Sequence, residues 1–355
     1  MATINGTNNA DTKYGTSSAD TISGLGGNDT LYGRAGNDII RGGTGGDKIW
    51  GEAGNDSMYG DDGDDFIYGG DGNDVVLGGI GNDTLYGDAG TDTVRGDAGN
   101  DTIKGGTGIS YLYGGDGNDQ IHYNPTTSNI SSVGSYLDDS LIYGGTGYDT
   151  LYLTNQATYT SGKTTKPAGT SINIGNDNVA QLSFEDPSYW NSIEVGKVRE
   201  VEKIIVGGSA PLDFISHYGS GAGVDVTGTA YADSFYSSIR SDTMRGGAGN
   251  DTFEILGGND VVTGTTSDAD TINVYTQYSA NLTVTGFNGE GAYGGDRLYF
   301  HDSFDPTTVS FSVTETAGKT VFALHGQNYY DYYSTTINVT VDKVGLEEGV
   351  DWFFV

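Results

Sequence analysis

The sequence of 355 residues contains no cysteine, only five prolines, and only 16 basic residues against 48 acidic ones. The absence of cysteine excludes both a disulfide framework and a thiolate metal site. No run of about 18 apolar residues occurs, so no segment is expected to span a membrane as a helix. The chain also opens without a positively charged segment followed by an apolar run, so we expect no conventional signal peptide.

The shortage of basic residues leaves a net charge of −32. Like charges at this density oppose compaction, so the folded state needs a positive partner. A nucleic acid is not expected to bind, because its phosphates would be repelled. The 60 glycines occur without proline at every third residue, which excludes collagen, and the 25 tyrosines argue against a disordered acidic tail.

What the chain does contain is a nine-residue repeat, which runs eleven times without interruption over residues 24–122. Positions one and four are always glycine, and position eight is always aliphatic or methionine. Position six is aspartate in ten copies and Ser110 in the other. Four fixed positions over eleven copies indicate a repeat architecture.

The fixed positions predict short β-strands stacked as coils. Closely spaced glycines permit the positive φ angles that a tight turn needs. Positions six to nine are rich in threonine, valine, isoleucine and tyrosine, which suits a brief strand with the position-eight side chain pointing inward. One unit cannot bury that side chain alone, so we expect two nonapeptides to form an 18-residue coil and the coils to stack about 4.8 Å apart.

Stacking also places the aspartates of alternate repeats, such as Asp56, Asp74 and Asp92, in a column. Carboxylates about 5 Å apart repel one another unless a cation lies between them. Together with the turn carbonyls they form a hard oxygen ligand set, which suits Ca²⁺ better than Zn²⁺ or Cu²⁺. About a dozen bound Ca²⁺ ions would bring the net charge of −32 to about −8. The sequence therefore predicts several bound Ca²⁺ ions, roughly one for each stacked turn.

The pattern GGxGxDxUx, as in residues 69–77 and 246–254, resembles the repeats-in-toxin (RTX) or haemolysin-type calcium-binding family. The resemblance covers residues 15–122 closely, and 144–152 and 228–272 more loosely. It implies an all-β fold, a parallel β-roll or β-solenoid, with Ca²⁺ held between turns by aspartate side chains and turn carbonyls.

The resemblance also implies a set of metal ligands. The aspartates are Asp29, Asp38, Asp47, Asp56, Asp65, Asp74, Asp83, Asp92, Asp101, Asp119, Asp149, Asp251 and Asp260. The glycines that would offer carbonyls are Gly27, Gly36, Gly45, Gly54, Gly63, Gly72, Gly81, Gly90, Gly99 and Gly117. The asparagines are Asn28, Asn37, Asn55, Asn73, Asn82, Asn100 and Asn118. Because Ser110 departs from the motif, its site is expected to be weak or vacant.

Members of that family leave bacteria through type I secretion, unfolded and with an uncleaved C-terminal signal. Residues 351–355, Asp-Trp-Phe-Phe-Val, look like the acidic and then hydrophobic end of several such substrates. The alternative is an ordinary last β-strand. The resemblance implies the type I machinery as a partner and a secreted, extracellular or bacterial cell-surface location.

Five regions are expected along the chain. Residues 1–23 form an N-terminal cap with a degenerate repeat, and residues 24–152 form the main roll with a polar insertion at 123–143. Residues 153–227 are a non-repeat, β-rich segment, in which 197–206 is a strand or a short helix. Residues 228–272 form a second RTX block, and 273–355 form an antiparallel β cap with the secretion signal, covering an edge that would otherwise pair.

No catalytic motif stands out. The sequence has four histidines and lacks the HExxH, GxSxG and GxxxxGK[ST] patterns. Acidic pairs are too abundant to single out a glycosidase dyad. RTX enzymes usually carry a catalytic domain before the repeats, whereas about 23 residues precede them here. We therefore expect no enzymatic activity.

Position nine of alternate repeats forms a second column, with Tyr32, Trp50, Tyr68, Tyr86, Lys104 and His122. One interpretation is an aromatic ladder that stabilises stacked strands. The other is a flat stripe that binds glycans or a neighbouring subunit.

The favoured function is a secreted calcium-binding structural protein, a surface-layer or matrix component that assembles outside the cell. An adhesin or carbohydrate-binding module is the alternative. A polysaccharide-modifying enzyme in residues 153–227 is a third, weaker hypothesis.

Overall fold

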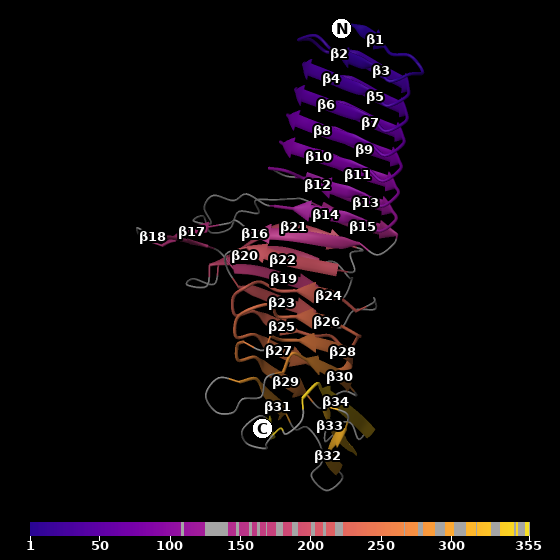
Figure 1. Cartoon of the computed structure of the whole chain (residues 1–355). Coiled ribbons are helices and arrows are strands. Elements are labelled where there is room, and N and C mark those ends of the chain that lie inside the picture. The colour runs from indigo at the N-terminus through magenta and orange to yellow at the C-terminus, as the bar shows by residue number, and fades with distance from the viewer. Residues whose placement is uncertain are drawn as a thin grey trace. The chain divides into compact units, whose positions relative to one another are not determined.

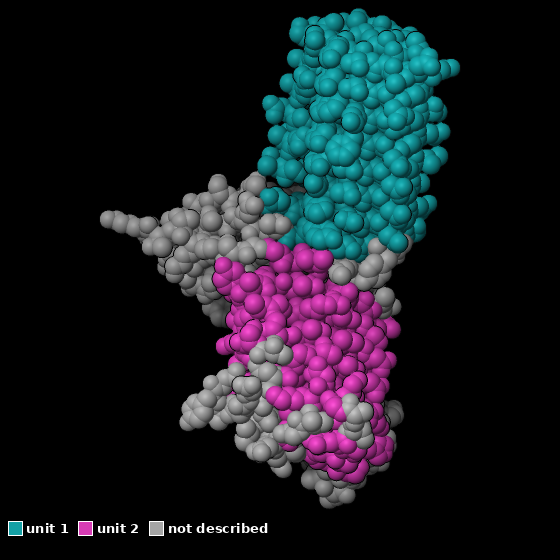
Figure 2. Space-filling view, viewed as in Figure 1, with its two compact units in different colours: residues 1–167, 182–203 teal, residues 168–181, 204–355 magenta. Residues whose placement is uncertain are grey.

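The computed structural model has an all-β fold, and no helix occurs among the residues that it describes. These residues are 1–107, 110–124, 141–146, 149–155, 158–161, 164–167, 169–174, 180–186, 191–199, 203–208, 211–216, 223–265, 267–275, 280–287, 295–301, 310–316, 318–327, 334–343, 346 and 352–354. The chain divides into two compact units, residues 1–167 with 182–203 and residues 168–181 with 204–355 (Figure 2). Each unit is a parallel roll, which confirms the predicted fold class.

Unit 1 winds between two parallel sheets (Figure 1). The first contains β1 (Thr3–Asn5), β3 (Thr21–Gly26), β5 (Ile39–Thr44), β7 (Ser57–Asp62), β9 (Val75–Ile80), β11 (Asp92–Ala98), β13 (Ser110–Asp116), β15 (Leu141–Thr146) and β21 (Asn191–Arg199). The second contains β2 (Thr12–Tyr14), β4 (Thr30–Ala35), β6 (Lys48–Ala53), β8 (Phe66–Asp71), β10 (Thr84–Ala89), β12 (Thr102–Lys104), β14 (Gln120–Tyr123) and β16 (Thr150–Asn155). A separate antiparallel pair joins β17 (Thr158–Ser161) to β18 (Thr164–Pro167).

The register of these sheets confirms the 18-residue coil. Ile22 pairs with Ile40 in one sheet, and Leu31 pairs with Ile49 in the other. The offset grows between β13 and β15, where Tyr111 pairs with Leu141. Residues 141–143, which the sequence placed inside an insertion, therefore lie in a strand of the roll.

The core of unit 1 consists mainly of position-eight side chains, which point inward from both sheets, as the pattern predicts. Every one of them has an exposed fraction of 0%. They are Leu31, Ile40, Ile49, Met58, Ile67, Val76, Leu85, Val94, Ile103, Leu112 and Ile121. With so little apolar volume for each coil, the turns must contribute stability of their own.

Unit 2 continues the same design with larger core residues, such as Phe235 and Phe253, whose rings stack with centroids 4.9 Å apart. One parallel sheet contains β19 (Gly169–Ile174), β23 (Leu212–Ser216), β25 (Ser234–Tyr236), β27 (Thr252–Ile255), β29 (Thr271–Tyr275), β31 (Arg297–His301) and β35 (Trp352–Phe354). The other contains β24 (Asp225–Thr227), β26 (Thr243–Arg245), β28 (Gly258–Thr263), β30 (Ala280–Thr285) and β34 (Ser334–Val341). Two strands, β20 (Ala180–Asp186) and β22 (Lys203–Gly208), contain residues of both units.

The C-terminal antiparallel sheet is present. It joins β32 (Ser310–Thr316), β33 (Lys319–Gln327) and β34. In the same region β34 also pairs in parallel with β30, and β35 pairs in parallel with β31. The roll therefore extends into residues that the sequence assigned to an antiparallel cap. Residues 197–206, expected as a strand or a short helix, supply parts of β21 and β22.

Candidate calcium-binding turns

The position-six aspartates form a hydrogen-bonded column along the roll. Asp29, for example, stands just before β4, and its amide N–H donates to Oδ1 of Asp47, one coil onward, at 2.7 Å. Asp38 donates in the same way to Oδ1 of Asp56, at 2.7 Å. One oxygen of each carboxylate is thus held in place by the backbone of the neighbouring coil.

The second carboxylate oxygen, Oδ2, is buried and has no hydrogen-bond partner in most of these turns. Within the described residues this holds for Asp29, Asp38, Asp47, Asp56, Asp65, Asp74, Asp83, Asp92, Asp101, Asp119, Asp251, Asp260 and Asp270. Burying a carboxylate oxygen without a hydrogen-bond donor costs free energy. A repeated series of such oxygens therefore indicates a bound ligand that interacts with each of them.

The glycine at position one brings this oxygen close to a main-chain carbonyl. A Cβ atom on Gly24 would lie 2.1 Å from Oδ2 of Asp29 and 2.5 Å from the carbonyl oxygen of Gly42. A Cβ atom on Gly42 would meet Oδ2 of Asp47 at 2.2 Å and the carbonyl oxygen of Gly60 at 2.7 Å. Carboxylate and carbonyl oxygens therefore converge beside the position-one glycines from Gly24 to Gly96 and at Gly114, and this donor set fits Ca²⁺.

Burial changes the protonation of the column. It raises the pKa of Asp38, Asp47 and Asp56 to about 6. It raises the pKa of Asp101 to about 7 and that of Asp65 to about 8, where neighbouring aspartates add to the effect. A bound cation would counter both causes, because it replaces the lost hydration and separates the like charges.

Position-five asparagines form a second ladder, which the sequence did not reveal. Oδ1 of Asn37 accepts the N–H of Asn55 at 3.0 Å, and Oδ1 of Asn55 accepts that of Asn73 at 2.9 Å. These bonds run toward the N-terminus, opposite to the aspartate bonds, and they lie on the exposed side of the turn. The asparagine side chains thus lock the coils together, whereas the sequence suggested only their carbonyls as ligands.

Among the residues that the structure describes, four turns differ, because their aspartate Oδ2 accepts hydrogen bonds within the same turn. Oδ2 of Asp20 accepts the N–H of Thr16 at 2.6 Å and its hydroxyl at 2.7 Å. Oδ2 of Asp233 accepts the N–H of Thr229 at 2.6 Å and its hydroxyl at 3.1 Å. We call these turns, residues 6–11, 15–20, 228–233 and 237–242, the capped turns. The sequence signal for them is threonine or serine at position two.

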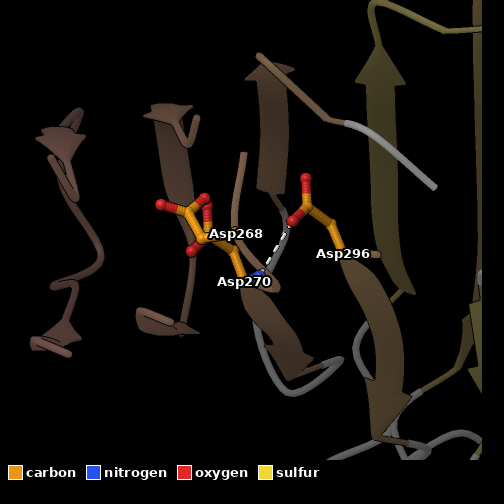
Figure 3. Close-up of side chains that lie close together, drawn as sticks. All are labelled: Asp268, Asp270 and Asp296. Carbon is orange, nitrogen blue, oxygen red and sulfur yellow. Dashed lines mark hydrogen bonds between the residues drawn. The ribbon is translucent and has the colours of Figure 1, made fainter. Parts of the chain in front are cut away.

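A further feature beyond the predicted set is a group of three carboxylates in unit 2, Asp268, Asp270 and Asp296 (Figure 3). One oxygen from each lies within 4.8 Å of the others. Asp270 and Asp296 are buried, and Oδ1 of Asp296 accepts the N–H of Asp270 at 2.8 Å. These residues follow an irregular repeat, so the nonapeptide pattern did not identify them.

The position-nine residues stack as the spacing predicts. Ring centroids lie 4.8 Å apart between Tyr32 and Trp50, and 4.4 Å apart between Tyr68 and Tyr86. The column begins one coil earlier than expected, at Tyr14, whose ring lies 5.0 Å from that of Tyr32. At the other end, Lys104 Nζ lies 4.8 Å from the Tyr86 centroid.

Comparison with known proteins identifies the repeats. The model of the RTX calcium-binding nonapeptide repeat matches residues 5–40, 14–49, 32–67, 41–76, 68–103, 95–124 and 227–262. A search of curated proteins found no match. The chain therefore carries calcium-binding RTX repeats in both units, and the matches include all four capped turns. The individual ligands and the number of ions stay predictions.

The serine at position six illustrates how a turn adapts. Oγ of Ser110 donates to the carbonyl of Gly105 at 3.4 Å, so the side chain bonds within its own turn. The weak or vacant site expected there stays a prediction.

Proposed function

We propose that this chain is a secreted, non-enzymatic calcium-binding structural protein, whose rolls fold and assemble at the cell surface when Ca²⁺ binds. The observation that carries the proposal is the column of buried Oδ2 atoms without partners, which from Asp29 to Asp119 lie beside backbone carbonyls. RTX repeats are typical of secreted proteins, and low Ca²⁺ inside the cell would leave such a chain unfolded for export. Among the described residues, no helix has the length and hydropathy to cross a bilayer.

Sedimentation velocity across a Ca²⁺ titration of the chelator-treated protein tests both parts of this proposal. We expect an expanded monomer in chelator and large ordered species at saturating Ca²⁺. Compaction to a species that stays monomeric would support calcium-dependent folding and remove assembly. An unchanged sedimentation coefficient would contradict the whole proposal.

The second candidate function is glycan binding, as in an adhesin, and the aromatic column favours it. Tyr32, Trp50, Tyr68 and Tyr86 are half-buried and stacked, so they form a continuous row on one sheet. A Tyr68→Ala/Tyr86→Ala variant that still binds Ca²⁺ should lose retention on a glycan array if the column binds sugars. Unchanged retention, or no retention by the native chain, would assign the rings to stacking alone. Turnover of a polysaccharide panel by the native chain would instead support the enzymatic hypothesis.

A further inference from the structure

We propose that the residue at position two decides whether a turn takes a cation, and that the four capped turns bind none. This inference rests on the proposed calcium-binding function, and it subdivides the turns that the repeat pattern treats as alike. All four capped turns have threonine or serine at position two: Thr7, Thr16, Thr229 and Ser238.

The capped turns share one hydrogen-bond arrangement. In each, the position-two N–H and hydroxyl donate to Oδ2 of the aspartate four residues later. The same hydroxyl accepts the N–H of position four, at 3.1 Å from Tyr231 to Thr229 and 3.0 Å from Arg240 to Ser238. Two protein donors thus bind Oδ2, the carboxylate oxygen that has no donor in the turns of the column, which we call the cation-type turns. A cation could bind Oδ2 of a capped turn only after breaking both hydrogen bonds.

The backbone explains why position two is the deciding residue. In the turns of residues 24–101, non-glycine residues at this position adopt left-handed φ angles, such as 78° at Leu25, 77° at Arg34 and 71° at Glu52. A β-branched threonine strongly disfavours that region. Among the described residues, none of the four capping residues has a positive φ. Threonine therefore selects the turn in which its own N–H reaches the carboxylate.

In the N-terminal pair of capped turns, the pKa shifts agree with this division. Hydrogen bonds from Thr7 lower the pKa of Asp11, and those from Ala2 and Thr16 lower the pKa of Asp20. One coil onward, Asp38 lies in a cation-type turn, in which the aspartate Oδ2 has no protein partner. There, burial instead raises the pKa of Asp38 to about 6. The Asp11 and Asp20 carboxylates are thus stable as anions without any metal, whereas burial still raises the pKa of the capped Asp233.

Each pair of capped turns stands one coil before cation-type turns. The N–H of Asp20 donates to Oδ1 of Asp38 at 2.7 Å, and the N–H of Asp233 donates to Oδ1 of Asp251 at 2.9 Å. A turn that closes without metal therefore positions the first carboxylates that need one. In this way the capped turns serve as metal-free templates for the calcium-binding coils.

Anomalous diffraction from crystals of the full chain grown with Ca²⁺ or Tb³⁺ tests the assignment directly. We expect peaks about 2.3–2.6 Å from Oδ2 of Asp38 and Asp56, and none beside Asp20, Asp233 or Asp242. A peak at a capped turn would overturn the inference while leaving the proposed function intact. The absence of peaks throughout would overturn the proposed function first.

Exchanging the two turn types gives a solution test in both directions, read by native mass spectrometry at saturating Ca²⁺. The variant Leu25→Thr/Gly26→Ser/Gly27→Ser/Asn28→Ala copies residues 15–20 into the turn of Asp29 and should bind at least one ion fewer. Its matched control, Leu25→Gly, keeps a left-handed position two and should bind the native number. Conversely, Thr229→Gly/Tyr231→Gly opens a capped turn and should bind one ion more. Native stoichiometry in both exchanged variants would contradict the rule.

The three-carboxylate group supports a second inference, carried by a different observation. The turn at residues 264–270 has Thr265 at position two but one residue more before its aspartate than a capped turn has. The Thr265 hydroxyl donates to Asp268 rather than to Asp270. Oδ2 of Asp270 thus lacks the hydroxyl bond of a capped turn and stays buried without a hydrogen bond of normal geometry, although the Thr265 backbone lies close enough to favour its anion. Asp270 is only 2% exposed.

We infer that Asp268, Asp270 and Asp296 hold a hard divalent cation in a site with three carboxylates instead of the repeat arrangement. Asp268→Asn tests this, because the amide side chain would lose the charge yet keep an oxygen for the N–H of Gly249, which Asp268 Oδ2 accepts at 2.9 Å. The control is Asp342→Asn, since Asp342 Oδ2 accepts the N–H of Gly286 at 2.9 Å outside the group. We expect the first variant to bind one Ca²⁺ fewer and the second the native number. Equal stoichiometry in the two variants would overturn the site.

Discussion

The capped turns at residues 6–20 and the cation-type turns of residues 24–122 have aspartate at position six, except at Ser110, and these aspartates form the same type of Oδ1 hydrogen-bond ladder. The two regions differ in the hydrogen bonds of Oδ2. In the first region Oδ2 accepts bonds from a threonine, and in the second it has no protein donor. The same strand geometry thus accompanies two kinds of turn, one closed by the chain and one with an open carboxylate oxygen. We therefore expect calcium dependence to differ between individual turns.

Removing Ca²⁺ should produce the largest difference in stability between the capped turns and the cation-type turns. At 100 times its dissociation constant, each bound ion stabilises the fold by about 2.7 kcal/mol, so a column of sites dominates the stability. In chelator, we expect hydrogen exchange at amides such as those of Ile49, Ile67 and Leu85 to be several orders of magnitude faster than in the Ca²⁺-bound form. The amides of Thr229 and Ser238, bonded within their own turns, should change less. Uniform loss of protection across both groups would remove the distinction.

Acid should partly replace Ca²⁺ in the column. Burial raises the pKa of Asp47 to about 6 and that of Asp65 to about 8, above the unfolded value of 3.8. A raised folded pKa favours the folded state at low pH, and this contribution is lost as pH rises through about 6 to 8. The metal-free chain should therefore gain β-structure between pH 8 and pH 4.5, measured by circular dichroism in chelator.

A salt control distinguishes this titration from relief of the overall charge. High NaCl at pH 8 screens the net charge of −32 but leaves the buried carboxylates ionised. Equal gains from salt and acid would argue against a specific role for the column. Asp11 and Asp20 do not contribute in this window, because hydrogen bonds lower their pKa values.

Without Ca²⁺, single carboxylate changes should have opposite effects on stability in the two kinds of turn. Asp65→Asn keeps an Oδ1 acceptor for the N–H of Asp47 but loses a cation ligand, so it should cost about 2–3 kcal/mol with Ca²⁺. Without Ca²⁺ the same variant should be stabilised, because a buried charge is gone. Asp20→Asn should lower the melting temperature in both conditions, since its amide would face the N–H of Thr16. Calorimetry with and without chelator measures all four cases, and a destabilised metal-free Asp65→Asn would refute the explanation.

Removing a cap should cost no more stability than losing a cation ligand, and the cost should not depend on Ca²⁺. Thr229→Val keeps the β-branched shape but removes the hydroxyl bonds to Asp233 and to the N–H of Tyr231. We expect a loss of about 1.5–3 kcal/mol in urea unfolding, equal with and without Ca²⁺, and near-native stability for Thr229→Ser. A loss confined to the Ca²⁺ form would place Asp233 among the cation ligands instead.

Much of this architecture could be predicted from the sequence, because the nonapeptide fixes local geometry and stacking follows from it. Leu31 and its equivalents, the aspartate column and the Tyr32–Trp50 stack all depend on constant spacing. The prediction was less complete where spacing changes. The extra residue before Asp270 brought Asp268 and Asp296 into one group, and the pairings of β34 with β30 and of β35 with β31 join segments with no shared pattern. In the sequence, the caps on Asp20 and Asp233 appear only as threonines in degenerate repeats. Their role could be recognised only from the hydrogen bonds that the structure shows.

The change of register between β13 and β15 has a consequence for engineering. Neighbouring coils from β1 to β14 pair at an offset of 18 residues, whereas Tyr111 pairs with Leu141 and His122 with Tyr152. The Asp119 amide still finds Oδ1 of Asp149 at 2.9 Å, so the ladder continues after the longer connection. Extra length at one turn is thus accommodated without disturbing either sheet, which makes the connection after β14 a natural place to graft a foreign peptide for display.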